Sequence, residues 1–261
     1  MHEQRERASS DASGHVESPI EAAPVEDGPW VAAGPGATAM AERLAPPSRV
    51  LILLDERQRD LQERGRLGVA PENIVIGPAR AGSALRVLLP FVSLSQRAPS
   101  AVVVALLSGA EPAVDDRELC EAVRCATRLA RSDDERVFLM GSKPSVADWA
   151  RSWAVTGPRL SDGTFLVESF VERPSPQRAQ QLFERGALWA GPALVATVTA
   201  MLSLFERTLS VPLDLLRQSP SAPSGSWLLR GLYEATPPAD FGYDVLQAAP
   251  ERLRLVPVEA T

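Results

Sequence analysis

Histidine is almost absent from the sequence, which holds only His2 and His15 among its 261 residues. Both fall in an N-terminal stretch whose composition predicts disorder, so the folded part is expected to contain no histidine. Imidazole is the side chain most suited to general base chemistry near neutral pH, and it is a common metal ligand. The sequence therefore excludes His-dependent catalytic triads and zinc sites of the HExxH type in the folded part.

Lysine and cysteine are scarce as well. Only Lys143 among the 27 basic residues is a lysine, so phosphate contacts are expected mainly from arginine, backbone amides or a helix N-terminus. Two cysteines are too few for a disulfide framework and indicate a reducing, cytoplasmic setting. Cys120 and Cys125 lie five residues apart in a helical pattern, so their side chains point about 140° apart and cannot share a metal ion.

The sequence also lacks an excess of positive charge and any long apolar run. A net charge of -6 argues against nucleic acid or an anionic membrane as a partner, because such partners require clustered basic residues. The charged N-terminus contains no apolar signal region, and no run of about 18 apolar residues occurs. We expect neither export by a recognisable signal nor a membrane-spanning segment.

The distribution of residue types divides the chain into two parts. Residues 1–36 are rich in Ala, Gly, Pro, Ser and Glu without apolar periodicity, which is typical of a disordered tail. Residues 37–261 show periodic apolar segments throughout and contain no internal repeat. The sequence thus predicts a disordered tail followed by one globular domain.

Apolar runs without alternation mark four expected strands of that domain, at residues 50–54, 73–77, 101–107 and 136–141. Such runs are typical of strands that are buried on both faces of a parallel sheet. Helical patterns lie between the runs, and a regular order of strands and crossover helices builds a doubly wound sheet. We therefore expect a three-layer α/β/α fold with a mostly parallel sheet.

Four segments in collinear order resemble the mannose-1-phosphate guanylyltransferases, a family of sugar nucleotidyltransferases. The segments are PENIVIGPARAGSALRVLLP at 71–90, VVVALLSGAEP at 102–112, FVERPSPQRAQQLFERGALWAGPALV at 170–195 and PADFGYDVLQAAPERLRLVPV at 238–258. The resemblance implies a nucleotidyltransferase fold of the Rossmann-like, GT-A type. It also implies an enzyme that makes GDP-mannose from GTP and mannose 1-phosphate with Mg²⁺.

The resemblance assigns roles to six residues. Those that it places at the sugar phosphate are Glu172, Arg173 and Asp240, and those that it places in the loop at the nucleotide base are Arg80, Gly82 and Ser83. Two simpler interpretations stay open. Glu172 and Arg173 can form a solvated ion pair at a strand end, and Ser83 can cap a helix after a strand-to-helix turn.

Several departures from the family pattern predict a loss of catalysis. The phosphate-binding loop G-G-x-G-T-R-L is not recognisable, and AGPGATA at 33–39 is interpreted as linker because no strand is expected before it. The family's metal-binding aspartate aligns with Gly109, and a second metal aspartate has no counterpart before Thr261. We therefore expect that the protein lacks the family's first strand and phosphate loop and needs no cofactor, Mg²⁺ included.

Further departures affect the expected sugar site. Arg173 replaces a lysine, Ala150 and Ser152 replace two glycines, and Ala190 replaces an asparagine. These changes favour a non-catalytic member of the family that assists regulation or assembly, with a second copy or another nucleotidyltransferase as partner. Such a protein would bind GTP or a sugar phosphate weakly. The alternative is an active sugar nucleotidyltransferase that uses substitutes for the missing residues.

Overall fold

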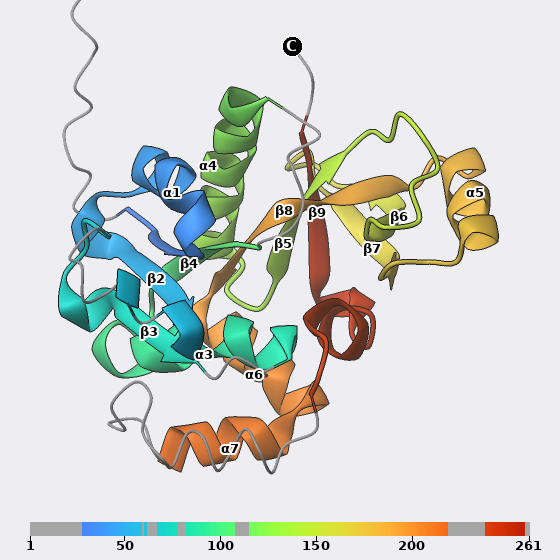
Figure 1. Ribbon diagram of the computed structural model, residues 1–261. Helices are drawn as coiled ribbons and strands as arrows, with labels where there is room; N and C mark the ends of the chain where they lie inside the picture. The colour runs from blue at the N-terminus through green and yellow to red at the C-terminus, as the bar shows by residue number, and fades with distance from the viewer. Residues whose placement is uncertain are drawn as a thin grey trace, which may run out of the picture.

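The computed structural model describes residues 28–58, 60–61, 67–77, 82–107, 115–218 and 238–258. The disorder predicted for residues 1–27 lies outside this range, as do the predicted roles of Arg80 and Gly109. One sheet of nine strands runs through the described part of the chain, in the order β3-β2-β1-β4-β8-β5-β9-β7-β6 (Figure 1). The strands are β1 (Trp30–Ala33), β2 (Val50–Asp55), β3 (Ile74–Gly77), β4 (Val102–Leu106), β5 (Val137–Ser142), β6 (Trp153–Arg159), β7 (Phe165–Val171), β8 (Leu188–Thr197) and β9 (Leu253–Val258).

The four strands expected from the sequence are present as β2, β3, β4 and β5. The sheet, however, is mixed: β1, β2, β3 and β4 are parallel neighbours, whereas β8 lies antiparallel between β4 and β5. The expectation of a mostly parallel sheet is thus corrected. An apolar run shows that a strand is buried on both faces, but it does not encode the direction in which the strand enters the sheet.

Residues 30–33 correct a second expectation, because they form a central strand and not part of a disordered tail. Val31 of β1 pairs with Val50 on one side and with Val104 on the other, and it is fully buried. The first strand of the fold is therefore present, and AGPGATA at 33–39 begins at its end. The sequence gives little sign of this strand, because it has only four residues and the burial of three of them depends on neighbouring strands and helices that lie far away in the sequence.

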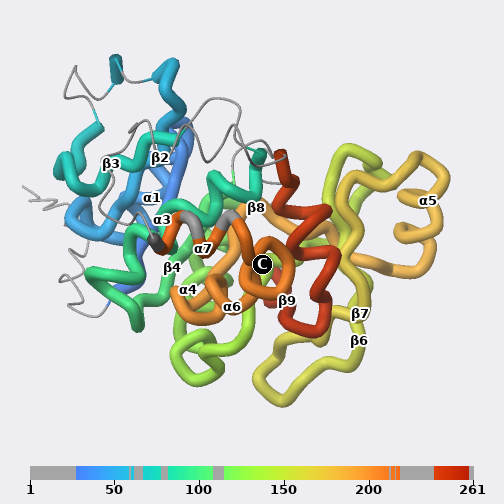
Figure 2. The backbone as a smooth tube through the Cα atoms, turned by 90° about the horizontal axis from the view of Figure 1, so that it is seen from below, coloured from blue at the N-terminus to red at the C-terminus, as the bar shows by residue number. Residues whose placement is uncertain are grey.

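Helices cover both faces of the sheet, as Figures 1 and 2 show. The helices are α1 (Thr38–Leu44), α3 (Ser83–Arg97), α4 (Asp116–Ser132), α5 (Pro176–Glu184), α6 (Val198–Thr208) and α7 (Ser210–Gln218). Two apolar clusters reflect this division, since alternate residues of a strand face opposite sides. One cluster joins Ala32 and Val103 to α3, α6 and α7, and the other joins Val31 and Val104 to α1 and α4.

Local signals explain where several helices begin. Asp115 caps α4 by accepting a hydrogen bond from the Arg117 amide, and Ser175 caps α5 by accepting one from the Arg178 amide. Thr197 performs the same role for α6 through the Ala200 amide. These caps fix the residue at which each helix begins.

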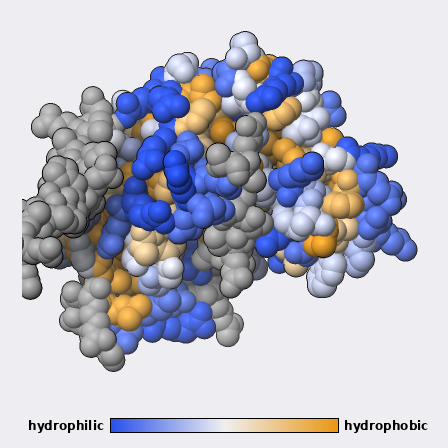
Figure 3. Space-filling model, turned by 90° about the horizontal axis from the view of Figure 1, so that it is seen from above, coloured by the Kyte–Doolittle hydropathy of each residue, from blue (hydrophilic) through white to orange (hydrophobic). Residues whose placement is uncertain are grey.

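The exposed surface mixes residue types. On the face in Figure 3, hydrophobic and hydrophilic residues are interspersed. Among the described residues, no helix combines the length and the apolar character that crossing a bilayer would require.

The correction at β1 can be tested by shortening one side chain. Val31→Ala should lower the free energy of unfolding by about 2 kcal/mol, because it removes buried methyl groups from a central strand. Urea denaturation measures this change. Val211→Ala is the matched control, since Val211 is exposed on α7 and its truncation should leave stability nearly unchanged. Equal stabilities of the two variants would contradict a central strand at residues 30–33 and would favour the interpretation of these residues as part of a disordered tail.

Candidate functional site

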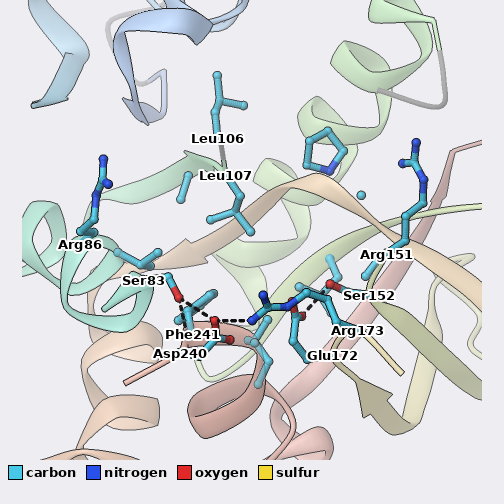
Figure 4. A pocket seen from close by; sticks show the side chains of 18 of the residues that line it. Ser83, Arg86, Leu106, Leu107, Arg151, Ser152, Glu172, Arg173, Asp240 and Phe241 are labelled. Atoms are coloured by element: carbon cyan, nitrogen blue, oxygen red, sulfur yellow. Dashed lines mark hydrogen bonds and ion pairs between the residues drawn. The ribbon is translucent and has the colours of Figure 1, made fainter. Parts of the chain in front are cut away.

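A cavity of about 750 Å³ opens beside the carboxyl ends of β1 and β4. Its walls come from these two strands, from the first turns of α3, from β8 and from the loops before β6 and after β7 (Figure 4). A single π-helical turn at Phe241–Leu246, called the π turn below, completes the wall. Ligands of open α/β sheets bind outside the carboxyl ends of strands, so this cavity is the candidate functional site.

Three residues that the sequence assigns to a sugar phosphate meet in the cavity. The Arg173 Nη2 atom lies 2.9 Å from Asp240 Oδ2, and its Nε atom lies 3.3 Å from Glu172 Oε1. We call these three residues the acid–arginine cluster. The Glu172 side chain is only 15% exposed, whereas the Arg173 side chain is 59% exposed, so the cluster has one buried carboxylate and a guanidinium that reaches solvent. Two carboxylates and one guanidinium leave it with a formal charge of -1.

The loop that the sequence assigns to a nucleotide base contacts this cluster directly. Ser83 donates a hydrogen bond from Oγ to Asp240 Oδ2 over 3.2 Å, and Ser83 Oγ accepts one from the Phe241 amide over 2.8 Å. The N-cap of α3 is Gly82, and no side chain caps this helix. The interpretation of Ser83 as a helix cap is therefore wrong, because its hydroxyl bonds Asp240 and the first residue of the π turn, Phe241.

Two glycines permit the close contacts on which this arrangement depends. A Cβ atom on Gly82 would lie 2.1 Å from the Ala239 carbonyl oxygen, which accepts a hydrogen bond from the Ala84 amide. A Cβ atom on Gly242 would lie 2.1 Å from Glu172 Oε2. Any larger residue at either position would separate α3 from the π turn or displace the Glu172 carboxylate.

The backbone of Arg173 has an uncommon conformation. Its φ of 39° lies in the left-handed region, where a residue other than glycine costs on the order of 1–3 kcal/mol. The ion pairs to Glu172 and Asp240 hold the side chain over the cavity and offset this cost. Residues in such conformations concentrate at ligand sites, which is consistent with a binding role for Arg173.

Ser152 occupies a position to which the sequence resemblance assigned a glycine. Its hydroxyl donates a 2.6 Å hydrogen bond to Glu172 Oε2, and the Glu172 amide donates one to Gln247 Oε1 over 3.1 Å. The sequence showed that a side chain replaces a glycine here, but it did not predict this bond. The guanidinium carbon of neighbouring Arg151 lies 4.6 Å from the Trp189 ring centre, and Arg151 Nε lies 3.3 Å from Asp148 Oδ2. Trp189 is buried against Trp153, as expected of a core residue.

One arginine of the cavity was missed by the sequence analysis. Arg86 lies one turn into α3 and lines the wall near the end of β1. Nearby, Asp55 at the end of β2 binds Arg57, with 3.0 Å between Oδ2 and Nη2. That hydrogen bond lowers the pKa of Asp55, against the opposing effect of burial, and the charge of Arg86 contributes a smaller lowering. Only the sheet topology brings these residues together, so periodicity could not reveal them.

The connection after β1 bears on phosphate binding. Only residues 34–37 separate β1 from α1, and Pro35–Ala37 form a 3-10 turn. Within the described ranges no group of His, Cys, Asp and Glu residues could hold a metal ion. The segments that contain Gly109 and Arg80 lie outside those ranges.

The contact at Gly82 generates a prediction. Gly82→Ala should lower the free energy of unfolding by about 1–3 kcal/mol, because the new Cβ would meet backbone atoms of Ala239 that cannot rotate away. Gly36→Ala is the matched control, since a Cβ atom there meets nothing within 4 Å. Denaturant unfolding of both variants measures the difference. If both variants are as stable as the natural protein, the described contact between α3 and Ala239 does not form.

Comparisons with known proteins support the fold. No protein-family model matches the sequence, and no curated protein matches it. Among solved structures, the chain is similar to mannose-1-phosphate geranyltransferase from Thermus thermophilus, with a TM-score of 0.71 and 22% identity over 88% of this chain and 73% of that one. It is also similar to mannose-6-phosphate isomerase from Helicobacter pylori, with a TM-score of 0.66 and 13% identity over 87% of each chain. The chain therefore has the α/β fold of these two structures.

Proposed function

We propose that the protein is a sugar nucleotidyltransferase-like protein that binds a sugar phosphate or a nucleotide sugar in the cavity beside β1 and β4. The acid–arginine cluster carries this proposal. Glu172 and Arg173 follow β7 and Asp240 precedes the π turn, yet their side chains meet at one wall of a cavity. An arginine can bind phosphate through two parallel hydrogen bonds, while carboxylates accept hydrogen bonds from sugar hydroxyls.

The ligand class is supported by two independent lines. Both similar structures are of proteins named after a mannose phosphate. The sequence segments around Ser83, Glu172 and Asp240 resemble the mannose-1-phosphate guanylyltransferases, and the structure brings these three segments to one cavity. Mannose 1-phosphate and GDP-mannose are therefore the first ligands to test.

We further propose that the protein does not catalyse nucleotidyl transfer and acts as a regulatory or assembly partner of a second copy or of another nucleotidyltransferase. The short connection after β1 supports this, because it cannot form the family's phosphate loop. The described carboxylates of the cluster do not fit Mg²⁺ either. Both carboxylates contact the Arg173 guanidinium, whose positive charge would repel a divalent cation from the same oxygens.

The cluster also sets how tightly a phosphate can bind. An incoming phosphate must share or displace the two carboxylates that already contact Arg173, and its own negative charge adds to the formal -1 of the cluster. We therefore expect weak binding by the natural protein. Removing one carboxylate charge should release Arg173 and strengthen binding.

Calorimetric titration with mannose 1-phosphate tests the binding site. Asp240→Asn should tighten binding about tenfold, because it removes one competing charge while an amide oxygen can still accept the Tyr243 amide. Arg173→Ala should abolish the heat of binding. Arg185→Ala, on the exposed end of α5, is the control and should bind as the natural protein does. Equal heats of binding for the natural protein and Arg173→Ala would contradict a binding role for Arg173 and leave its contacts to Glu172 and Asp240 as a structural ion pair.

Coupled pyrophosphate release tests the proposed lack of catalysis. Incubation with GTP, mannose 1-phosphate and Mg²⁺ should give no signal above the blank without protein, since the short connection between β1 and α1 offers few backbone amides to hold the triphosphate. A signal well above the blank that Glu172→Ala abolishes would contradict this proposal. It would establish the alternative, an active sugar nucleotidyltransferase that makes GDP-mannose.

A further inference from the structure

We propose that Arg86 binds a phosphate group of a nucleotide ligand at the β1 end of the cavity, in place of the missing phosphate loop. The inference rests on the proposed function only for the class of ligand. The position of Arg86, its lack of a bonded partner among the described residues and the apolar walls around it carry the rest.

The three arginines that line the cavity differ in their partners. Arg173 contacts Glu172 and Asp240, and Arg151 contacts Asp148 and stacks on the Trp189 ring. Arg86 forms no hydrogen bond or ion pair through its side chain with any residue in the described ranges. The carboxylate that it faces at longer range is that of Asp55, which is already bonded to Arg57. Arg86 is therefore the arginine of the cavity whose charge remains available to a ligand.

The position of Arg86 is unfavourable for the folded protein alone. It lies in the first turns of α3, where the positive end of the helix dipole repels a cation. Its side chain is half-buried, and the neighbouring wall contains the apolar side chains of Leu53, Val87 and Leu106. Burial of a charge without a bonded partner costs free energy. A bound phosphate would remove both penalties, since it would neutralise the guanidinium and interact favourably with the helix N-terminus.

The space beside Arg86 suits a phosphate group. Gly34, at the end of β1, lines the same cavity, and a Cβ atom on it would meet nothing within 4 Å. The ligand can therefore approach the backbone closely at this point. Figure 4 shows Arg86 extending away from the acid–arginine cluster, with Ser83 on the same helix nearer to it. The two ends of the cavity can thus hold different parts of one ligand, with the nucleotide phosphate at Arg86 and the sugar at Glu172 and Asp240.

Calorimetric titration of the full chain with inorganic pyrophosphate tests the proposal. Pyrophosphate carries the charge of the nucleotide without sugar or base, and a comparison of the natural protein with an Arg86 variant isolates the contribution of Arg86. Arg86→Gln should weaken binding by about tenfold or more, because it removes a charge-assisted hydrogen-bond donor pair. The affinity of Arg86→Lys for pyrophosphate should lie between those of the natural protein and Arg86→Gln, since lysine keeps the charge but loses the planar geometry. Arg124→Gln, an equal charge change on the exposed face of α4, should bind as the natural protein does.

A second measurement avoids any dependence on a variant. Phenylglyoxal modifies accessible arginines, and mass spectrometry locates the modified residues. Pyrophosphate should protect Arg86 from modification in the natural protein and leave Arg124 reactive.

Thermal unfolding of Arg86→Gln should occur at the same temperature as in the natural protein or at a higher one, because the substitution removes a repelled cation. A lower unfolding temperature would show that Arg86 serves stability and would overturn the proposal.

The remaining outcomes separate this inference from the proposed function. Failure of the natural protein to bind pyrophosphate, or equal affinity of Arg86→Gln and the natural protein, overturns the role of Arg86. If mannose 1-phosphate still binds through Arg173 in that case, the proposed function stands without it. If pyrophosphate binds through Arg86 and protects it while neither mannose 1-phosphate nor GDP-mannose binds, the phosphate site stands and the sugar ligand is wrong.

Discussion

The site depends on one close backbone contact between residues that are far apart in the sequence. The Ala84 amide donates to the Ala239 carbonyl over 3.1 Å, and the Phe241 amide donates to Ser83 Oγ over 2.8 Å. Only a residue without a side chain at position 82 allows the two backbones to approach this closely. The contact orders the start of α3 and the residues before the π turn together. It thereby places Asp240 beside Arg173. It also places Arg86 along the same wall of the cavity.

Charge balance within the cavity explains why its two ends differ. At the acid–arginine cluster, two carboxylates compete for one guanidinium, so an anion gains little there unless a carboxylate is displaced. At the β1 end, Arg86 faces only the longer-range charge of Asp55 among the described carboxylates, and Arg57 already balances that charge. The low polarity of the surrounding side chains strengthens any interaction that Arg86 makes. The proposals therefore assign the nucleotide phosphate to Arg86 and the sugar phosphate to the acid–arginine cluster.

Two irregular backbone segments meet at the cluster. Arg173 has a positive φ, and Phe241–Leu246 form a π-helical turn where an α-helix would otherwise be expected. Such turns are frequent at functional sites. Here the π turn allows Gly242 to lie against the Glu172 carboxylate while Asp240 accepts a hydrogen bond from the Tyr243 amide. Ser152 and Gln247 complete the bonds around Glu172, so a regular helix in this place would break several contacts at once.

The sequence by itself determined which segments form most of the core. Unalternating apolar runs located β2, β3, β4 and β5. Collinear motifs assigned Glu172, Arg173 and Asp240 to a sugar phosphate and Ser83 to a separate nucleotide-base loop, and only the structure showed that Ser83 contacts Asp240. Tertiary structure alone decided the rest. The direction of β8 and the burial of β1 depend on neighbouring strands, because neither an apolar run nor a four-residue segment encodes its partners. The hydroxyl of Ser83 bonds across the fold and not to its own helix, and Arg86 reaches the cavity through the packing of α3, so local patterns could not reveal either.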